Sequence, residues 1–146
     1  MAIERPELGF LLNRLLREVI EREQPILQKR ELDMWDYVVL AALGTGPSPT
    51  QNELAGLTGR DKTRLIRNLD RLEERGLLSR TPDPSDRRNR IVTLTAEGRS
   101  LLVSCRADIR AMEEDLLADV ESRDRTGFES TLQALVRNRN GRDPRP

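Results

Sequence analysis

The sequence predicts a mainly α-helical fold that includes one small β-hairpin. Charged residues form 34% of the 146-residue chain and aromatic residues only 3%, so a core must be built mainly from Leu, Val, Ile and Ala. Leucines recur at helical spacing through most of the chain, which predicts amphipathic helices. Only segments 77–81 and 90–94 read as strands, and the turn-rich residues 82–89 between them predict a hairpin.

Two short helices stand immediately before this hairpin. The first is predicted over residues 49–57, where Ser48 caps the helix and opens a capping box. The second is predicted over residues 61–75 and stops at Gly76. Two short helices followed by a charged hairpin predict a winged helix-turn-helix, which we place at about residues 32–95.

Four further helices are predicted around these two. They cover residues 5–22, 33–43, 96–119 and 125–137, each with apolar residues at spacings of three and four. Pro25 is expected to kink or end the first of them, because proline lacks an amide donor, and a continuation through Ile26 and Leu27 stays open.

The flanking segments are predicted to be dimerisation helices of a single-domain chain. They cover about residues 5–31 and 96–138, and residues 139–146 are expected to be a tail. Within the predicted 96–119 helix, apolar residues repeat at heptad-type spacing at Leu102, Cys105, Ile109, Met112 and Leu116. Phe128, Leu132 and Leu135 are expected to face inward from the last helix. One chain would leave much of this apolar surface exposed, so we expect a homodimer.

The formal net charge is zero, but the charges are unevenly distributed. Residues 58–90 carry ten Lys or Arg and six Asp or Glu, a net charge of +4. Residues 106–124 carry three bases and seven acids, a net charge of −4. One segment can therefore face phosphate while another repels it.

The basic segment, residues 58–90, has the composition of a DNA-binding element. A helix in the major groove needs an apolar back, here Leu65, Leu69 and Leu72, and a donor-rich front. The predicted recognition-helix contacts are Lys62, Thr63, Arg64, Arg67 and Asn68. The predicted wing contacts, which suit a narrow minor groove, are Arg87, Arg88 and Arg90. The predicted phosphate contacts at the start of the first short helix are Thr50 and Gln51.

The composition argues against catalysis, metal binding and cofactor binding. The chain has no histidine and a single cysteine, Cys105, which removes the commonest general base and leaves too few zinc ligands. No nucleophile elbow or phosphate-cradling glycine loop is present. Neither a membrane-spanning stretch nor a secretory signal is recognised, so we expect a cytoplasmic protein that is not an enzyme.

Four short motifs resemble the MarR family of winged helix-turn-helix transcription regulators. They are NELA at residues 52–55, LEERGLLSR at 72–80, DPSDRR at 83–88 and LTAEG at 94–98. The resemblance covers about residues 5–138. It implies a triangular dimer that binds near-palindromic double-stranded operators. It also implies a repressor that releases DNA when a small, often phenolic, ligand enters a cleft.

Several alternatives stay open from the sequence. An aromatic effector would suit a cleft lined by Phe10, Arg14, Trp35 and Tyr37, although ordinary core packing is the favoured explanation for the latter two. Cys105 is interpreted as a packing residue rather than a redox sensor. A DNA-architectural protein without sequence preference and a winged helix used only for protein contacts are the alternative functions.

Overall fold

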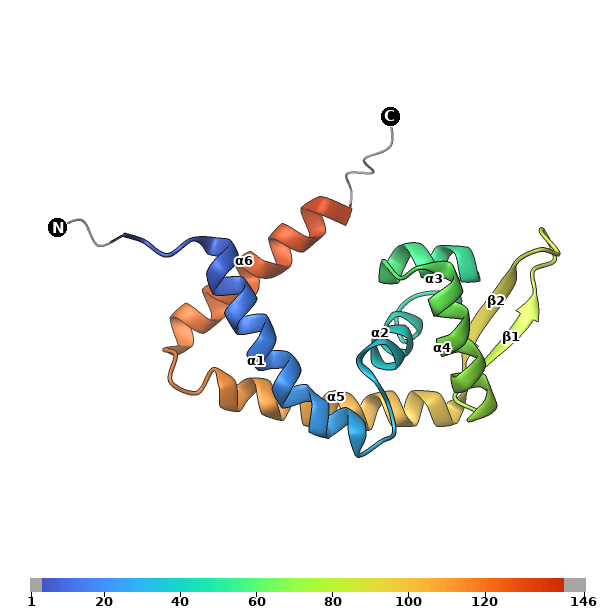
Figure 1. Cartoon of the computed structure of the whole chain (residues 1–146), viewed down its shortest axis with the longest axis horizontal. Helices are drawn as coiled ribbons and strands as arrows, with labels where there is room; N and C mark the ends of the chain where they lie inside the picture. Colours follow the sequence, from blue (N-terminus) through green and yellow to red (C-terminus); the bar gives the residue numbers. More distant parts are fainter. Residues whose placement is uncertain (1–3, 141–146) are drawn as a thin grey trace. The chain divides into compact units, whose positions relative to one another are not determined.

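The computed structural model describes residues 4–140, with the side chains of 138–140 excepted. Six helices and one hairpin follow each other along the described residues (Figure 1). They are α1 (Leu8–Gln28), α2 (Met34–Leu43), α3 (Gln51–Thr58), α4 (Lys62–Glu74), β1 (Leu78–Pro82), β2 (Arg90–Leu94), α5 (Ala96–Leu116) and α6 (Ser122–Asn140). The chain divides into two compact units, Met1–Arg110 and Ala111–Pro146.

Helix α1 is longer than the sequence predicts, because Pro25 neither ends nor interrupts it. The ring removes one amide donor, but the carbonyl of Pro25 still accepts from the amide of Lys29 at 3.1 Å. The chain then turns at Glu31, whose φ of 54° is the only positive value of a non-glycine residue among those described. Helix α2 follows, capped by Asp33 as predicted.

The predicted start of α3 is wrong. Thr50, not Ser48, is the N-cap, and its hydroxyl accepts from the amide of Glu53 at 3.2 Å. The two residues before the helix are extended instead, because they pair with β2. The carbonyl of Pro49 accepts from the amide of Val92 at 2.9 Å, and Thr50 forms a β-bridge with Ile91. Pairing with β2 therefore moves the N-cap of α3 from Ser48, which the local sequence favours, to Thr50.

Helix α4 agrees with its prediction at both ends. Asp61 caps it by accepting from the amide of Arg64 at 3.2 Å, and Gly76 follows it with a φ of 74°. The predicted apolar back is fully buried, at Leu65, Leu69 and Leu72.

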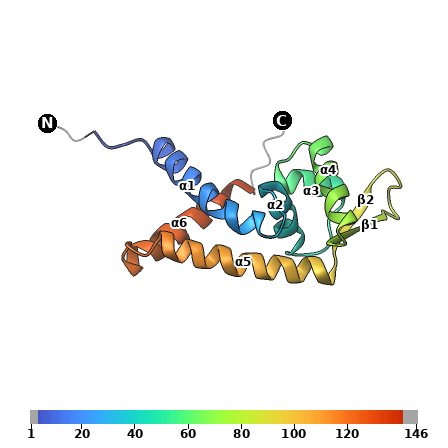
Figure 2. The same cartoon turned by 60° about the horizontal axis from the view of Figure 1, so that its bottom comes forward.

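The hairpin pairs antiparallel from Leu78↔Leu94 to Pro82↔Arg90, and Figure 2 shows it extending from the junction of α4 and α5. Its base is held tightly against the start of α5. A Cβ atom at Gly98 would stand 1.9 Å from the carbonyl oxygen of Leu77, so only glycine fits there. Thr95 caps α5 as its hydroxyl accepts from the amide of Gly98 at 3.0 Å and donates to the carbonyl of Gly76.

The heptad-type residues of α5 lie differently from what we expected. Leu102, Cys105 and Ile109 are buried within the chain's own core, so they are not free to cover a partner. Helix α5 packs behind α2, where the guanidinium of Arg106 donates to the carbonyl of Ala41. The physical reason is that α2 is apolar on several sides, so the side that faces α5 must also be buried.

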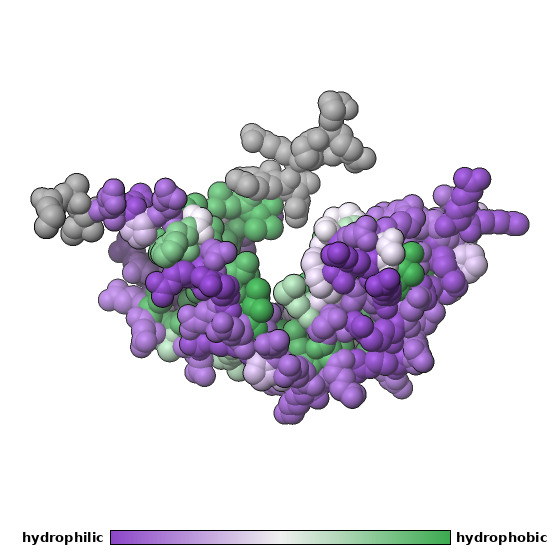
Figure 3. Space-filling model, in the orientation of Figure 1, coloured by the Kyte–Doolittle hydropathy of each residue, from purple (hydrophilic) through white to green (hydrophobic). Residues whose placement is uncertain are grey.

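Large apolar side chains remain exposed on α1 and α6. On α1 the exposed residues are Leu8, Phe10, Leu11, Leu12, Leu16 and Ile20. On α6, Phe128, Leu132 and Leu135 are exposed within one chain, so the prediction that they face its interior is wrong. Helix α6 also extends through residue 140, into the predicted tail, and residues 141–146 lie outside the described part. Figure 3 shows a mainly hydrophilic surface over the winged module.

Candidate nucleic-acid interface

Helix α4 presents a cationic face to solvent. Lys62, Thr63, Arg64 and Arg67 are all exposed, and the buried leucine stripe holds the opposite face. Among the described residues, neither Arg64 nor Arg67 has a side-chain hydrogen bond or ion pair. Two guanidinium groups are therefore presented with all their donors available for a ligand.

Asn68 is a correction to the predicted contacts. Its side chain is only 2% exposed and is hydrogen-bonded at both ends. Its Nδ2 donates to Oδ1 of Asp36 at 2.8 Å, and its Oδ1 accepts from Nε of Arg60 at 2.8 Å. An amide committed in this way cannot read an adenine edge, so the prediction of Asn68 as a base contact is wrong. It connects α4 to α2 instead.

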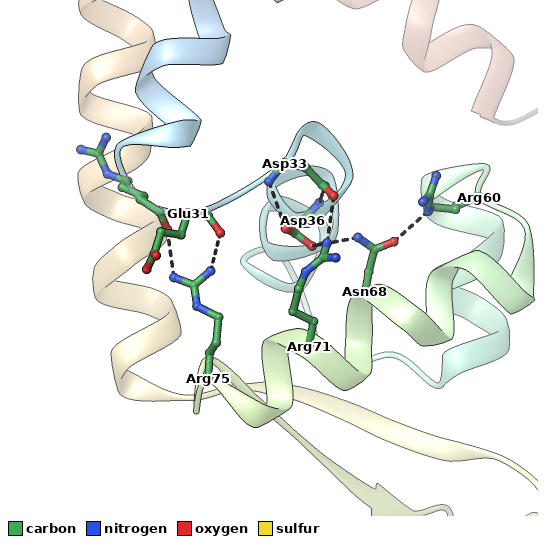
Figure 4. A network of polar contacts seen from close by, with 8 residues as sticks. Glu31, Asp33, Asp36, Arg60, Asn68, Arg71 and Arg75 are labelled. Carbon is green, nitrogen blue, oxygen red and sulfur yellow. Dashed lines mark hydrogen bonds and ion pairs between the residues drawn. The ribbon is translucent and has the colours of Figure 1, made fainter.

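A buried carboxylate fixes α4 against the start of α2 (Figure 4). Asp36 is 1% exposed, and its Oδ1 accepts from both Asn68 and Nη2 of Arg71, the latter at 2.6 Å. Arg71 also reaches Asp33 at 2.8 Å. The hydrogen bond to Asp36 raises the pKa of the Arg71 guanidinium above its usual value. Composition alone did not reveal this network, because its members lie more than 30 residues apart.

The far end of α4 is tied as well. Arg75 donates to the carbonyl oxygens of Glu31 at 2.7 Å and Arg30 at 2.9 Å, both in the connection between α1 and α2. Figure 4 shows Arg75, Arg71 and Asn68 all reaching from α4 towards this connection and α2. The helix that carries Arg64 and Arg67 is therefore held along its whole length.

The hairpin tip is ordered by backbone hydrogen bonds to short acidic side chains. Asp83 accepts from the amide of Ser85 at 2.9 Å, and Asp86 accepts from the amide of Arg88 at 3.0 Å. Asp86 therefore shapes the turn through the backbone of the hairpin tip. Arg87, Arg88 and Arg90 are exposed, although Arg90 also donates to the carbonyl of Arg80 at 3.2 Å.

Arg80 joins the hairpin to α4, and the sequence did not predict this role. Its side chain is only 9% exposed, and it pairs with Asp70 at 2.5 Å and with Glu73 at 3.0 Å. The hydrogen bond from Arg80 lowers the pKa of the Glu73 carboxyl. Arg80 also donates to Oε1 of Gln51 at 3.3 Å. Gln51 is buried, so the prediction of an exposed phosphate-contacting side chain is wrong for it, whereas Thr50 stays half-exposed.

The predicted effector cleft is not assembled within one chain. Its four residues are Phe10, Arg14, Trp35 and Tyr37. The two on α1 are exposed, whereas the ring of Trp35 lies against Arg60, with 4.4 Å from Cζ to the ring centroid. Tyr37 faces Arg106 instead, and burial raises the pKa of its hydroxyl.

Cys105 is fully buried, which supports its interpretation as a packing residue. Burial raises the pKa of its thiol, so little thiolate is present near neutral pH. Among the described residues no group of three or more acidic, His or Cys side chains is arranged to hold a metal ion. No described helix is both long and apolar enough to cross a membrane.

Comparison with known proteins identifies the family. A MarR-family sequence profile matches residues 32–89. A MarR-family regulator from Rhodococcus sp. RHA1 is 30% identical in sequence, with a TM-score of 0.79 over 88% of this chain and 91% of that chain. The repressor CouR, solved on a 23-mer DNA duplex, is 32% identical, with a TM-score of 0.77 over 89% of this chain and 92% of that chain.

CouR from Rhodococcus jostii RHA1 has also been solved with p-coumaroyl-CoA, at 28% identity, a TM-score of 0.74 and coverage of 88% of this chain and 91% of that chain. The transcriptional repressor NicR of Pseudomonas putida is 29% identical over 84% of this chain and 80% of its own length. These relatives are transcription regulators rather than enzymes. The similarity extends over nearly the whole chain and includes the winged module, so the chain belongs to the MarR family.

Proposed function

We propose that this chain is a sequence-specific regulator of transcription that binds double-stranded DNA. The proposal is carried by Arg64 and Arg67, which are exposed and have no side-chain partner among the described residues, on a helix that is anchored along its length. Arg87 and Arg88 at the hairpin tip supply a second cationic element suited to a minor groove. The relative CouR, which binds DNA, supports the same reading. Residues 32–95 would form the DNA-binding module, in a cytoplasmic protein without catalytic activity.

Selection of bound sequences from random duplex DNA tests this function directly. We expect a near-palindromic consensus, because a two-fold dimer sets two recognition helices about 34–36 Å apart. Enrichment without a consensus would indicate an architectural DNA-binding protein. No enrichment at any salt concentration would indicate a winged helix used only for protein contacts.

The exposed apolar faces of α1 and α6 support a homodimer. Leu12 is 41% exposed, and a charge there would have to be buried against a partner. We expect Leu12→Glu to shift the protein from dimer to monomer in sedimentation equilibrium. The matched control is Leu57→Glu, which alters an exposed leucine on α3 and should leave the dimer intact. A Leu12→Glu dimer as tight as the wild type would contradict this assignment of the interface.

We further propose that the protein represses its target and that a small aromatic ligand relieves repression. Support comes from CouR, a repressor that has been solved with p-coumaroyl-CoA. A screen of aromatic acids and their thioesters for release of the selected operator tests this regulation separately from DNA binding.

Arg67 is the best candidate for a base contact. It lies one turn beyond Arg64 on the exposed face, and guanidinium groups read guanine through two hydrogen bonds. We expect Arg67→Ala to weaken operator binding by about 1–3 kcal/mol and to relax the consensus at one position of each half-site. The matched control, Arg110→Ala, removes an exposed arginine of α5 outside the winged module. Equal affinity of Arg67→Ala and wild type for the operator would refute the contact.

A further inference from the structure

A groove of about 400 Å³ runs along one side of α4. Its walls are built by Asp33, Trp35, Arg60, Arg64, Arg67, Asn68 and Arg71. Arg64, Arg67 and Arg71 stand at spacings of three and four residues on one stripe of α4, and Arg60 immediately precedes the N-cap of that helix. A single half-exposed carboxylate, that of Asp33, opposes them, and it is already paired with Arg71. The groove therefore carries a net positive charge and favours an anion.

Arg60 is fixed in this groove by its own side-chain contacts, which Arg64 and Arg67 lack among the described residues. It stands between Gly59, which ends α3 with a φ of 66°, and the N-cap Asp61 of α4. Its Nε donates to Oδ1 of Asn68 at 2.8 Å, and its Cζ lies 4.4 Å from the centre of the Trp35 ring. The hydrogen bond fixes the position of the guanidinium group, and the contact with the indole restricts it further.

The support for Arg60 is itself buried and fixed. Asn68 is the residue that holds Nε, and its own orientation is set by Asp36, to which its Nδ2 donates. With Nδ2 donating to a carboxylate, Oδ1 must face Arg60, so the amide cannot exchange its two ends without breaking both bonds. Figure 4 shows this chain of contacts from Asp36 through Asn68 to Arg60.

The two terminal nitrogens of Arg60 remain available. Neither Nη1 nor Nη2 donates to another described residue, although the group is fixed through Nε. A guanidinium presents these nitrogens as two adjacent donors, which match two oxygens of a phosphate group. Because the side chain is already ordered, binding costs less conformational entropy than it would for a free arginine.

We propose that Arg60 is a preformed clamp for a backbone phosphate of DNA, supported by Asn68 and Trp35. This inference rests on the proposed function and adds to it a contact that lies outside the recognition helix. A phosphate is favoured over a base edge because Arg60 precedes α4, whereas Arg64 and Arg67 occupy the exposed face of the helix itself. A phosphate contact contributes affinity without sequence preference.

The experiment measures duplex affinity of Arg60→Ala, Arg60→Lys and wild type over a range of salt concentrations. Two duplexes are used, the selected operator and a scrambled sequence of equal length. Removing one phosphate contact should reduce the slope of log K against log[salt] by about 0.9 for each bound protomer. We expect Arg60→Ala to show this reduction on both duplexes, with an equal fold-loss of affinity on each. Arg60→Lys should keep the salt-dependence slope but bind both duplexes less tightly. Lysine retains the positive charge but lacks the two adjacent donors of the guanidinium group.

The controls separate failure of the clamp from failure of the function. Arg110→Ala should match the wild type, and thermal unfolding should show that each variant is folded. An unchanged slope for Arg60→Ala overturns the clamp while DNA binding by the wild type still supports the function. A loss confined to the operator also overturns it, because Arg60 would then read a base. Absence of any salt-dependent binding by the wild type overturns both.

Trp35 provides a second readout, since it is the only tryptophan of the chain. We expect its emission to change when duplex is added, with the same midpoint as binding measured by anisotropy. In Arg60→Ala the change on saturation should be clearly smaller than in Arg110→Ala. An emission change of the same size in Arg60→Ala would show that the phosphate is not held beside Trp35 through Arg60, and would overturn the proposal.

Discussion

Operator affinity of the wild-type protein should fall by about 10³–10⁵ when monovalent salt rises from 50 to 200 mM. This range corresponds to neutralisation of about 6–10 phosphates, whose condensed counterions are released on binding. The structure offers enough cations for this number in a dimer. Each protomer exposes Lys62, Arg64, Arg67, Arg87 and Arg88 on the predicted contact elements.

Fluorescence anisotropy with a labelled operator measures this dependence, and the wild type is compared with Arg87→Ala/Arg88→Ala. The double variant should bind more weakly and with a shallower slope, because two cations per protomer are lost at the hairpin tip. A wild-type affinity that does not change with salt would exclude phosphate contacts as the main source of binding. The winged module would then have to act on another kind of partner.

Asp36→Ala should lower the free energy of unfolding by about 2–4 kcal/mol. The substitution leaves Nδ2 of the buried Asn68 without an acceptor, which costs about 1–3 kcal/mol. It also removes the carboxylate that accepts from the amide of Asp33 at 3.0 Å, one half of the capping box that starts α2. Arg71 adds less to the loss, because its side chain is half-exposed and water can solvate it.

Urea unfolding measures this loss, and Asp115→Ala, an exposed carboxylate of α5, is the matched control. Asp36→Asn should be intermediate, since it retains one oxygen acceptor but not the charge opposite Arg71. A loss below about 0.5 kcal/mol for Asp36→Ala, the usual range of a surface substitution, would contradict the structural role of the network.

The helical order and the hairpin follow from local signals, and the structure agrees with them within a few residues. The periodicity of Leu65, Leu69 and Leu72, the cap at Asp61 and the glycine stop at residue 76 are all local, and they define α4. The start of α3 depends on distant pairing with β2, so the local capping rule selected the wrong residue. The local rule for proline at Pro25 was limited in the same way. Helix α1 continues on both sides of Pro25, so it tolerates the loss of one amide donor in its interior.

The prediction for Asn68 failed for a reason that the sequence contains. Residue 68 lies three positions after Leu65 and four before Leu72, so helical spacing already places it beside the buried stripe. Its polarity favoured an exposed position, since asparagine is seldom buried. What overrides that preference is Asp36, a partner 32 residues away that no spacing rule identifies.

The apolar repeat of α5 illustrates a different limit. Its period shows that Leu102, Cys105 and Ile109 face something apolar, but it cannot distinguish a partner chain from the same chain. The structure assigns these three residues to the core, and leaves the exposed faces of α1 and α6 as the surfaces available for a second copy.

The tether at Arg75 has a consequence for how this protein tolerates change. Both of its acceptors are main-chain oxygens, so replacing the side chain of Glu31 leaves the two hydrogen bonds in place. Side-chain substitutions in this connection therefore leave the position of α4 unchanged, and only a change in the path of the backbone or in Arg75 itself would alter it. Insertions or deletions between α1 and α2 should accordingly be far less tolerated than point substitutions there.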